Sequence, residues 1–122
     1  MRLVIKRSQA EQVGIFGGHK GMKFLLACRV DLTPEESGLV TKYKAEHELL
    51  THIKIGDDVK QSGFLFIKDL VAGKSYECKN VTELLQAEEE IKKGCENFKT
   101  LLTVMTSFGG EEVIEFSHPS KA

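Results

Sequence analysis

The strongest constraint on the fold of this chain is a run of apolar residues that recur every seven positions after Asn80. They form two adjoining rows on one helical face: Leu84, Ile91, Phe98 and Met105 on the first row, and Val81, Cys95 and Leu102 on the second. Asn80 and Glu83 fit a capping box, which starts a helix by satisfying its first free amide groups. The spacing predicts a helix from Asn80 to about Ser107, roughly 40 Å long at 1.5 Å per residue.

A helix of this length needs a long surface to cover its apolar face. Packing across a sheet accounts for the apolar stripe, although Glu88 interrupts one of its rows. A compact domain of this size has a diameter of only about 35 Å, estimated from radius-of-gyration scaling. The excess length leaves three alternatives: the helix overhangs, Gly94 bends it, or a second copy of the chain covers its end in a symmetric dimer.

A second helix and several strands are predicted from shorter patterns. Thr33, Pro34 and Glu36 form a capping box with proline at the first helical position, and this helix should run to about Glu46. Alternating apolar residues predict strands at 2–8, 22–32, 48–55, 62–70, 74–79 and 111–116. The strands at 62–70 and 74–79 should form a hairpin joined near Ala72 and Gly73. Because most connections are short, we expect an α+β fold: a mainly antiparallel sheet of about six strands with two helices on one face, in the order β-β-α-β-β-β-α-β.

Length and composition indicate a single domain over residues 1–122. Hydrophobic residues make up 41% of the chain and charged residues 29%, which are ordinary globular values. Cys28, Cys78 and Cys95 are widely spaced and form no C-x-x-C motif, so we expect free buried thiols and a cytoplasmic location. The longest apolar runs are far shorter than the roughly 20 residues that a membrane-spanning helix needs, so we expect no membrane association.

The glycine-rich stretch GIFGGHKG at residues 14–21 is the feature that most resembles a binding site. It lacks the G-K-[ST] register of a phosphate loop, and a predicted strand follows it where such a loop requires a helix. A weaker ligand or partner site is still consistent with the residue types, and its candidate residues are Phe16, His19, Lys20, Lys23 and Arg7. The alternative is a wide turn between two strands, with Phe16 folded back onto the core.

Charge is distributed unevenly along the chain. Residues 1–30 carry a net charge of +5, whereas the whole chain carries −1. Such an asymmetry marks an anion-binding face in some proteins and is neutralised by packing in others. His47 and His52 are five residues apart, which differs from the i,i+4 spacing of a helical metal site. No cofactor, metal or catalytic-triad motif is recognisable, so we predict no cofactor and no metal.

Three functional hypotheses follow in order of preference. The first is a small non-catalytic interaction or regulatory module, homodimeric and possessing a protein partner, with its binding face at the basic hairpin of residues 14–23. The second is a nucleic-acid-binding protein that uses the same hairpin, with Phe16 stacking on bases. The side chains expected on phosphates are Arg2, Lys6, Arg7, Lys20 and Lys23. The third is a small enzyme whose site is assembled only by the fold and is not visible in the sequence.

Overall fold

The computed structural model describes residues 1–13 and 19–117, and the side chains of residues 12, 13, 19 and 20 also lie outside the description. These residues contain five strands and three helices, in the order β-β-α-β-β-α-β-α. The strands form two antiparallel sheets, with strand orders β1-β2-β5 and β3-β4. The α+β class with antiparallel sheets is therefore confirmed, whereas the predicted single sheet of about six strands with two helices is wrong.

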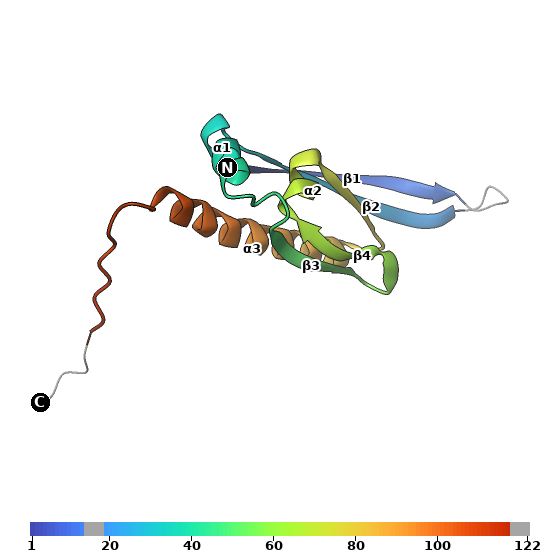
Figure 1. Cartoon of the computed structure of the whole chain (residues 1–122). Helices are drawn as coiled ribbons and strands as arrows, with labels where there is room; N and C mark the ends of the chain where they lie inside the picture. Colours follow the sequence, from blue (N-terminus) through green and yellow to red (C-terminus); the bar gives the residue numbers. More distant parts are fainter. Residues whose placement is uncertain (14–18, 118–122) are drawn as a thin grey trace, which may run out of the picture.

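The first sheet is built on a long hairpin of β1 (Arg2–Val13) and β2 (His19–Asp31). Figure 1 shows this hairpin reaching well past the other elements. β5 (Lys74–Cys78) pairs with the middle of β2, so β1 lies at the edge of the sheet. Leu26 and Cys28 point from β2 into the core, because alternate residues of a strand face opposite sides of its sheet.

The second sheet is a hairpin of β3 (Leu49–Ile55) and β4 (Asp58–Phe66). Its turn lies at Gly56, whose φ of 48° is a left-handed conformation that favours glycine. Ile53 and Leu65 point inward from these two strands and are almost completely buried. The predicted hairpin of residues 62–70 with 74–79 is wrong, because β4 pairs with β3 and β5 pairs with β2.

Among the described residues, hydrogen bonds between the two sheets come from the side chain of Gln61. The side-chain amide of Gln61, on β4, donates to the backbone oxygen of Glu77 at 2.9 Å and accepts a hydrogen bond from the backbone N–H of the same residue. The amide thus takes the place of a neighbouring strand along the outer edge of β5. Because these backbone groups would otherwise need water or another strand, Gln61 links the sheets without a continuous ladder.

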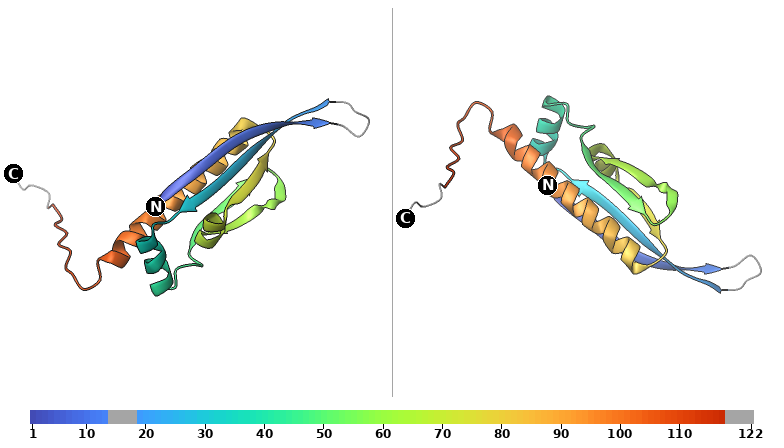
Figure 2. Two further views of the ribbon diagram at one scale, coloured as in Figure 1. Left: turned by 90° about the horizontal axis from the view of Figure 1, so that it is seen from above. Right: turned by 90° about the horizontal axis from the view of Figure 1, so that it is seen from below.

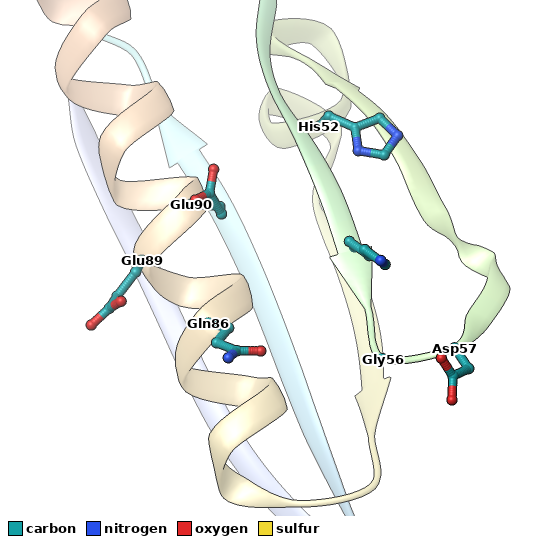
Figure 3. A pocket seen from close by; sticks show the side chains of 7 residues that line it. His52, Gly56, Asp57, Gln86, Glu89 and Glu90 are labelled. Atoms are coloured by element: carbon teal, nitrogen blue, oxygen red, sulfur yellow. The ribbon is translucent and has the colours of Figure 1, made fainter.

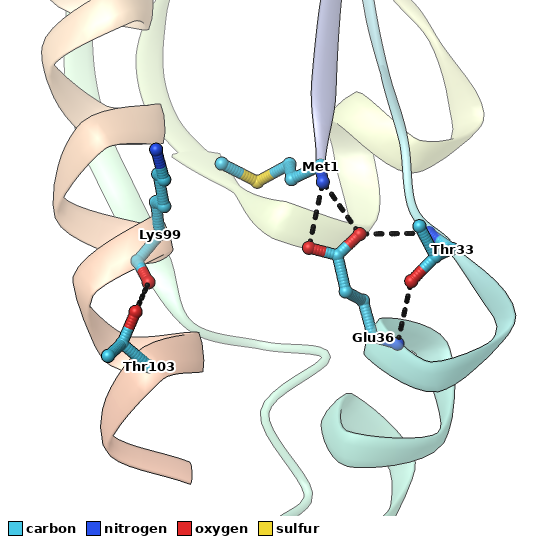
Figure 4. A network of polar contacts seen from close by, with 5 residues as sticks. All are labelled: Met1, Thr33, Glu36, Lys99 and Thr103. Carbon is cyan, nitrogen blue, oxygen red and sulfur yellow. Dashed lines mark hydrogen bonds and ion pairs between the residues drawn. The ribbon is translucent and has the colours of Figure 1, made fainter. Parts of the chain in front are cut away.

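Helix α1 (Pro34–Lys42) begins at the predicted capping box. Figure 4 shows the reciprocal bonds between Thr33 and Glu36, and the Glu36 carboxylate also lies 2.7 Å from the nitrogen of Met1. The helix ends four residues earlier than predicted, because Lys44 adopts a left-handed φ of 54°. Ala45 then donates to the carbonyl of Val40 at 2.8 Å, which is the bond that closes a Schellman motif.

Helix α2 (Ile67–Ala72) occupies residues that we expected to continue a strand. The Asp69 carboxylate accepts a hydrogen bond from the backbone N–H of Phe66 at 2.9 Å and so fixes the start of this helix. Ile67 and Leu70, three residues apart, both face the core and are completely buried or nearly so. Within residues 62–70 the apolar residues have period two up to Phe66 and helical spacing after it. The prediction of one strand over the whole segment was therefore wrong after Phe66.

Helix α3 (Val81–Thr106) confirms the long helix predicted after Asn80. It packs mainly against β3 and also touches β2, β5 and α1. Figure 2 shows it lying along one face of the β1-β2 hairpin, with β3 and β4 beside it. Among the described helices, this one included, none combines the length and apolar character needed to cross a membrane. Buried side chains from both sheets and all three helices form one cluster around α3.

The predicted closing strand at 111–116 is wrong. Residues 111–117 have no regular secondary structure and lead away from both sheets (Figures 1 and 2). Their apolar side chains are largely exposed, with exposed fractions of 80% for Val113, 64% for Ile114 and 82% for Phe116. The sequence has the alternation of a strand, but a strand forms only where a second edge satisfies its backbone groups.

Candidate functional site

The residues proposed for the basic hairpin site have different structural outcomes. Phe16 lies outside the described residues, and so do the side chains of His19 and Lys20, although both residues belong to β2. Arg7 and Lys23 are described, and they lie on opposite faces of the sheet. Arg7 is paired with Leu26, which faces the core, whereas Lys23 is paired with Ala10 on the other face. The described part of the hairpin therefore does not bring these two cations together.

Arg7 is engaged within the molecule. Its Nε and one terminal nitrogen bind the two oxygens of Glu88 on α3, at 2.6 and 2.5 Å. The Glu88 side chain is only 1% exposed, and this bidentate pairing lowers the pKa of its carboxyl group below the usual value. Lys92, one helical turn further along, lies 3.9 Å from the same carboxylate. The glutamate that interrupts the apolar row is thus neutralised by β1.

The excess positive charge of residues 1–30 is largely paired with acidic groups. Lys23 lies 3.3 Å from Glu77 on β5, and this pair is exposed. Arg2 and Arg29 both bind the carboxylate of Asp31, at 2.9 and 3.1 Å, which lowers the pKa of that carboxyl group. The three acidic partners, Asp31, Glu77 and Glu88, all belong to the acidic part of the chain, residues 31–122. Packing thus offsets much of the asymmetry that is visible in the sequence.

Two features of the β1-β2-β5 sheet form the candidate interaction surface. The first is the free edge of β1, which is 12 residues long and pairs only with β2 among the residues that the structure describes. The second is the outer face of the sheet, formed by the residues that alternate along each strand with those facing the core. It carries mainly basic and apolar side chains. The described members of this outer face on β1 are Arg2, Val4, Lys6, Ser8 and Ala10, and those on β2 are Lys23, Leu25, Ala27, Arg29 and Asp31.

This surface was missed because the predicted site lay at the tip of the hairpin rather than along its edge. The available signal was the segment RLVIK, which places Arg2, Val4 and Lys6 on one face of a strand and Leu3 and Ile5 on the other. Basic residues on an edge strand often prevent unwanted pairing, but they also select an acidic partner strand.

A wide hollow of about 670 Å³ lies between β3 and α3. It is lined by titratable and polar side chains, among them His52, Asp57, Glu89 and Glu90. Figure 3 shows these side chains pointing in different directions, with Glu89 turned away from β3 and His52 turned away from α3. Glu90 accepts a hydrogen bond from Thr51 at 3.0 Å, and the His52 ring packs edge-on against Phe64. The hollow therefore presents separate polar groups rather than a convergent set.

The other candidates from the sequence take ordinary structural positions. All three cysteines are free and buried, as predicted. Burial raises the pKa of Cys28 and of Cys95 to about 11 and raises that of Cys78 as well, so these thiols remain protonated near neutral pH. Within residues 1–13 and 19–117, no three His, Cys, Asp or Glu side chains are grouped as metal ligands.

A scan against protein-family models and searches among curated proteins and solved structures found no match to this chain.

Proposed function

We propose that this protein is a small non-catalytic interaction module that acts as a homodimer through the β1-β2-β5 sheet. The observation that carries the proposal is the long free edge of β1, since unpaired backbone groups along a strand are a template for a second chain. Free buried thiols support a reducing, cytoplasmic setting for such a module. The open hollow beside α3, with its divergent side chains, gives less support to an enzyme, which remains the third hypothesis.

The homodimer is tested by measuring mass in solution. Light scattering and sedimentation at micromolar concentration should give the mass of two chains, in equilibrium with one chain on dilution. Because a backbone ladder and apolar contacts are only weakly screened by salt, the dimer should persist in moderately concentrated salt. A mass of one chain across the whole concentration range would refute this proposal.

Nucleic-acid binding is the second candidate, and the outer face of the sheet is the observation that favours it. Lys6 and Lys23 share this face, and Lys6 makes no ion pair with any described residue. If the face binds phosphates, the affinity for nucleic acid should fall steeply as salt is raised. Replacing both lysines by alanine should then reduce the slope of log K against log salt by about 2.

A matched control for this measurement is Lys93→Ala, which removes one exposed lysine from α3. It should leave the salt dependence unchanged, because α3 lies on the side of the sheet opposite to the outer face. Equal slopes for the protein with and without Lys6 and Lys23 would exclude this face as a nucleic-acid site.

A further inference from the structure

Residues 111–117 form an apolar and acidic segment that has no regular secondary structure and lies exposed beside the rest of the described chain. Every residue in it is exposed, and Val113, Ile114 and Phe116 are exposed by 64% or more. Its sequence, EEVIEFS, alternates and is rich in β-branched and aromatic residues, which are the residues that strands favour. A segment of this composition gains stability by pairing with a sheet edge and burying its apolar side chains.

The first half of β1 has a complementary pattern. On the outer face of the sheet, Arg2, Val4 and Lys6 follow one another in the order basic, apolar, basic. On the inner face, Met1, Leu3 and Ile5 are only partly buried and pack against the core from its margin. The edge therefore offers a basic outer row and an incompletely covered apolar inner row.

The two patterns match in an antiparallel register. If Val113 lies opposite Val4, then Glu111 lies opposite Lys6 and Glu115 lies opposite Arg2, so that two ion pairs flank an apolar pair. On the inner face the same register places Ile114 beside Leu3 and Phe116 beside Met1, and it places Glu112 beside Ile5, the next inner-face residue before Arg7. Asp31 already holds both Arg2 and Arg29, so Arg2 can turn to a new carboxylate while Arg29 keeps Asp31 neutralised.

We propose that residues 111–116 of one copy add to the edge of β1 in a second copy, antiparallel to residues 1–6, and that the two copies exchange these segments reciprocally. The inference rests on the proposed homodimer and identifies the segment and the edge that form it. A reciprocal exchange of this kind has two-fold symmetry, because each copy supplies one edge and one segment.

A second copy is the occupant because the chain is too short to reach this register on its own β1. The Phe108 ring packs against Tyr43, with ring centroids 5.4 Å apart, and Tyr43 caps the end of α1. That helix lies at the start of β1, where Glu36 binds Met1 (Figure 4). Only two glycines separate Phe108 from Glu111, so these residues are three steps apart, about 10 Å of chain, whereas Lys6 lies five residues along β1, roughly 17 Å from Met1.

The path of the segment is consistent with exchange. In Figures 1 and 2, residues 111–117 leave the end of α3 on the side away from the β1-β2 hairpin. A second copy can receive the segment without any reversal of the chain at Gly109 and Gly110. Pairing would cover Ile114 and Phe116 together with the partly buried margin of the core at Met1 and Leu3.

Charge reversal on each side separately, followed by mixing, tests the exchange. Glu111→Lys/Glu115→Lys should weaken the wild-type dimer by about tenfold or more, because the two attractive pairs at each of its two segment–edge contacts become repulsive. Arg2→Glu/Lys6→Glu should weaken it similarly. An equimolar mixture of the two variants should regain wild-type affinity as a heterodimer, since each segment then meets an edge of opposite charge. Sedimentation equilibrium measures all three, and a mass tag on one variant identifies the heterodimer.

The control is Glu89→Lys/Glu96→Lys, which makes the same change in net charge at exposed positions on α3. It should leave the dimer affinity unchanged. A wild-type monomer would overturn both the homodimer and the segment exchange. A wild-type dimer whose affinity is unaffected by Glu111→Lys/Glu115→Lys, with no heterodimer on mixing, would overturn the exchange and leave the homodimer standing. The segment variants contact no described part of the folded body, so circular dichroism should show native folding in them.

Discussion

Replacing Gly94 by alanine should lower the free energy of unfolding by about 2 kcal/mol, although alanine is the better helix former. Gly94 lies where α3 crosses β3, and a Cβ built there would stand 2.9 Å from the carbonyl oxygen of Leu50. The same Cβ would lie 3.1 Å from the carbonyl carbon and from the Cβ of Leu50. Because these are mostly backbone atoms, the helix must move away from the sheet, and the buried contacts along it loosen.

Thermal unfolding followed by circular dichroism measures this effect, and a loss of that size should lower Tm by roughly 6–12 °C. The matched control is Gly38→Ala in α1, where an added Cβ meets no atom within 4 Å. That variant should be more stable by about 0.5–1 kcal/mol, through helix propensity alone. If both substitutions stabilise the protein equally, then α3 does not approach β3 as closely as the structure indicates.

The contrast between these glycines shows what the sequence could and could not predict. Both glycines lie inside predicted helices, and the apolar repeat identified the face of α3 that carries Gly94. The repeat gave no information on which strand the helix crosses, or how closely. A bend at Gly94 was one of the predicted alternatives, and the structure instead shows an unbroken helix with glycine at its contact with β3.

Local signals predicted the starts of elements better than their partners. The caps at Thr33 and Asn80 form hydrogen bonds to the backbone within three residues, so the sequence alone contains both members of each bond. The end of α1 depends on a left-handed Lys44 rather than on a glycine, and residue type gave no warning of it. Strand pairing depends on segments distant in sequence, which explains why β4 was assigned the wrong partner.

The candidate site shows the same limitation. The sequence identified a basic first segment, but only the fold shows that Arg7 faces inward to Glu88 while Lys23 faces outward. The period-two pattern of β1 identifies the two faces of the strand. It does not show that the edge of β1 opposite to β2 has no partner strand among the described residues. Similarly, residues 111–116 have the alternation of a strand but form none in the structure, because a strand also needs a partner edge that the alternation alone does not identify.

The Arg7–Glu88 pair should account for the largest electrostatic contribution to stability among the described ion pairs, because Glu88 is nearly inaccessible to water. Arg7→Ala leaves the Glu88 carboxylate with only Lys92 at 3.9 Å, so the free energy of unfolding should fall at neutral pH. Denaturant unfolding at pH 7 measures the loss. Removing the charge as well, in Arg7→Ala/Glu88→Met, should recover much of it, since an apolar side chain suits that row of α3.

The pH dependence distinguishes this explanation from a simple loss of packing by Arg7. In the native protein Arg7 holds the pKa of the Glu88 carboxyl group below its unfolded value of about 4.3, so the pair contributes fully above that pH. This contribution is lost as the pH falls through the lowered pKa of the folded state. In Arg7→Ala the sign reverses, because burial without the guanidinium raises the pKa of Glu88 and favours the neutral acid at low pH. The destabilisation caused by Arg7→Ala should therefore shrink between pH 7 and pH 4, whereas a packing defect would remain constant over that range.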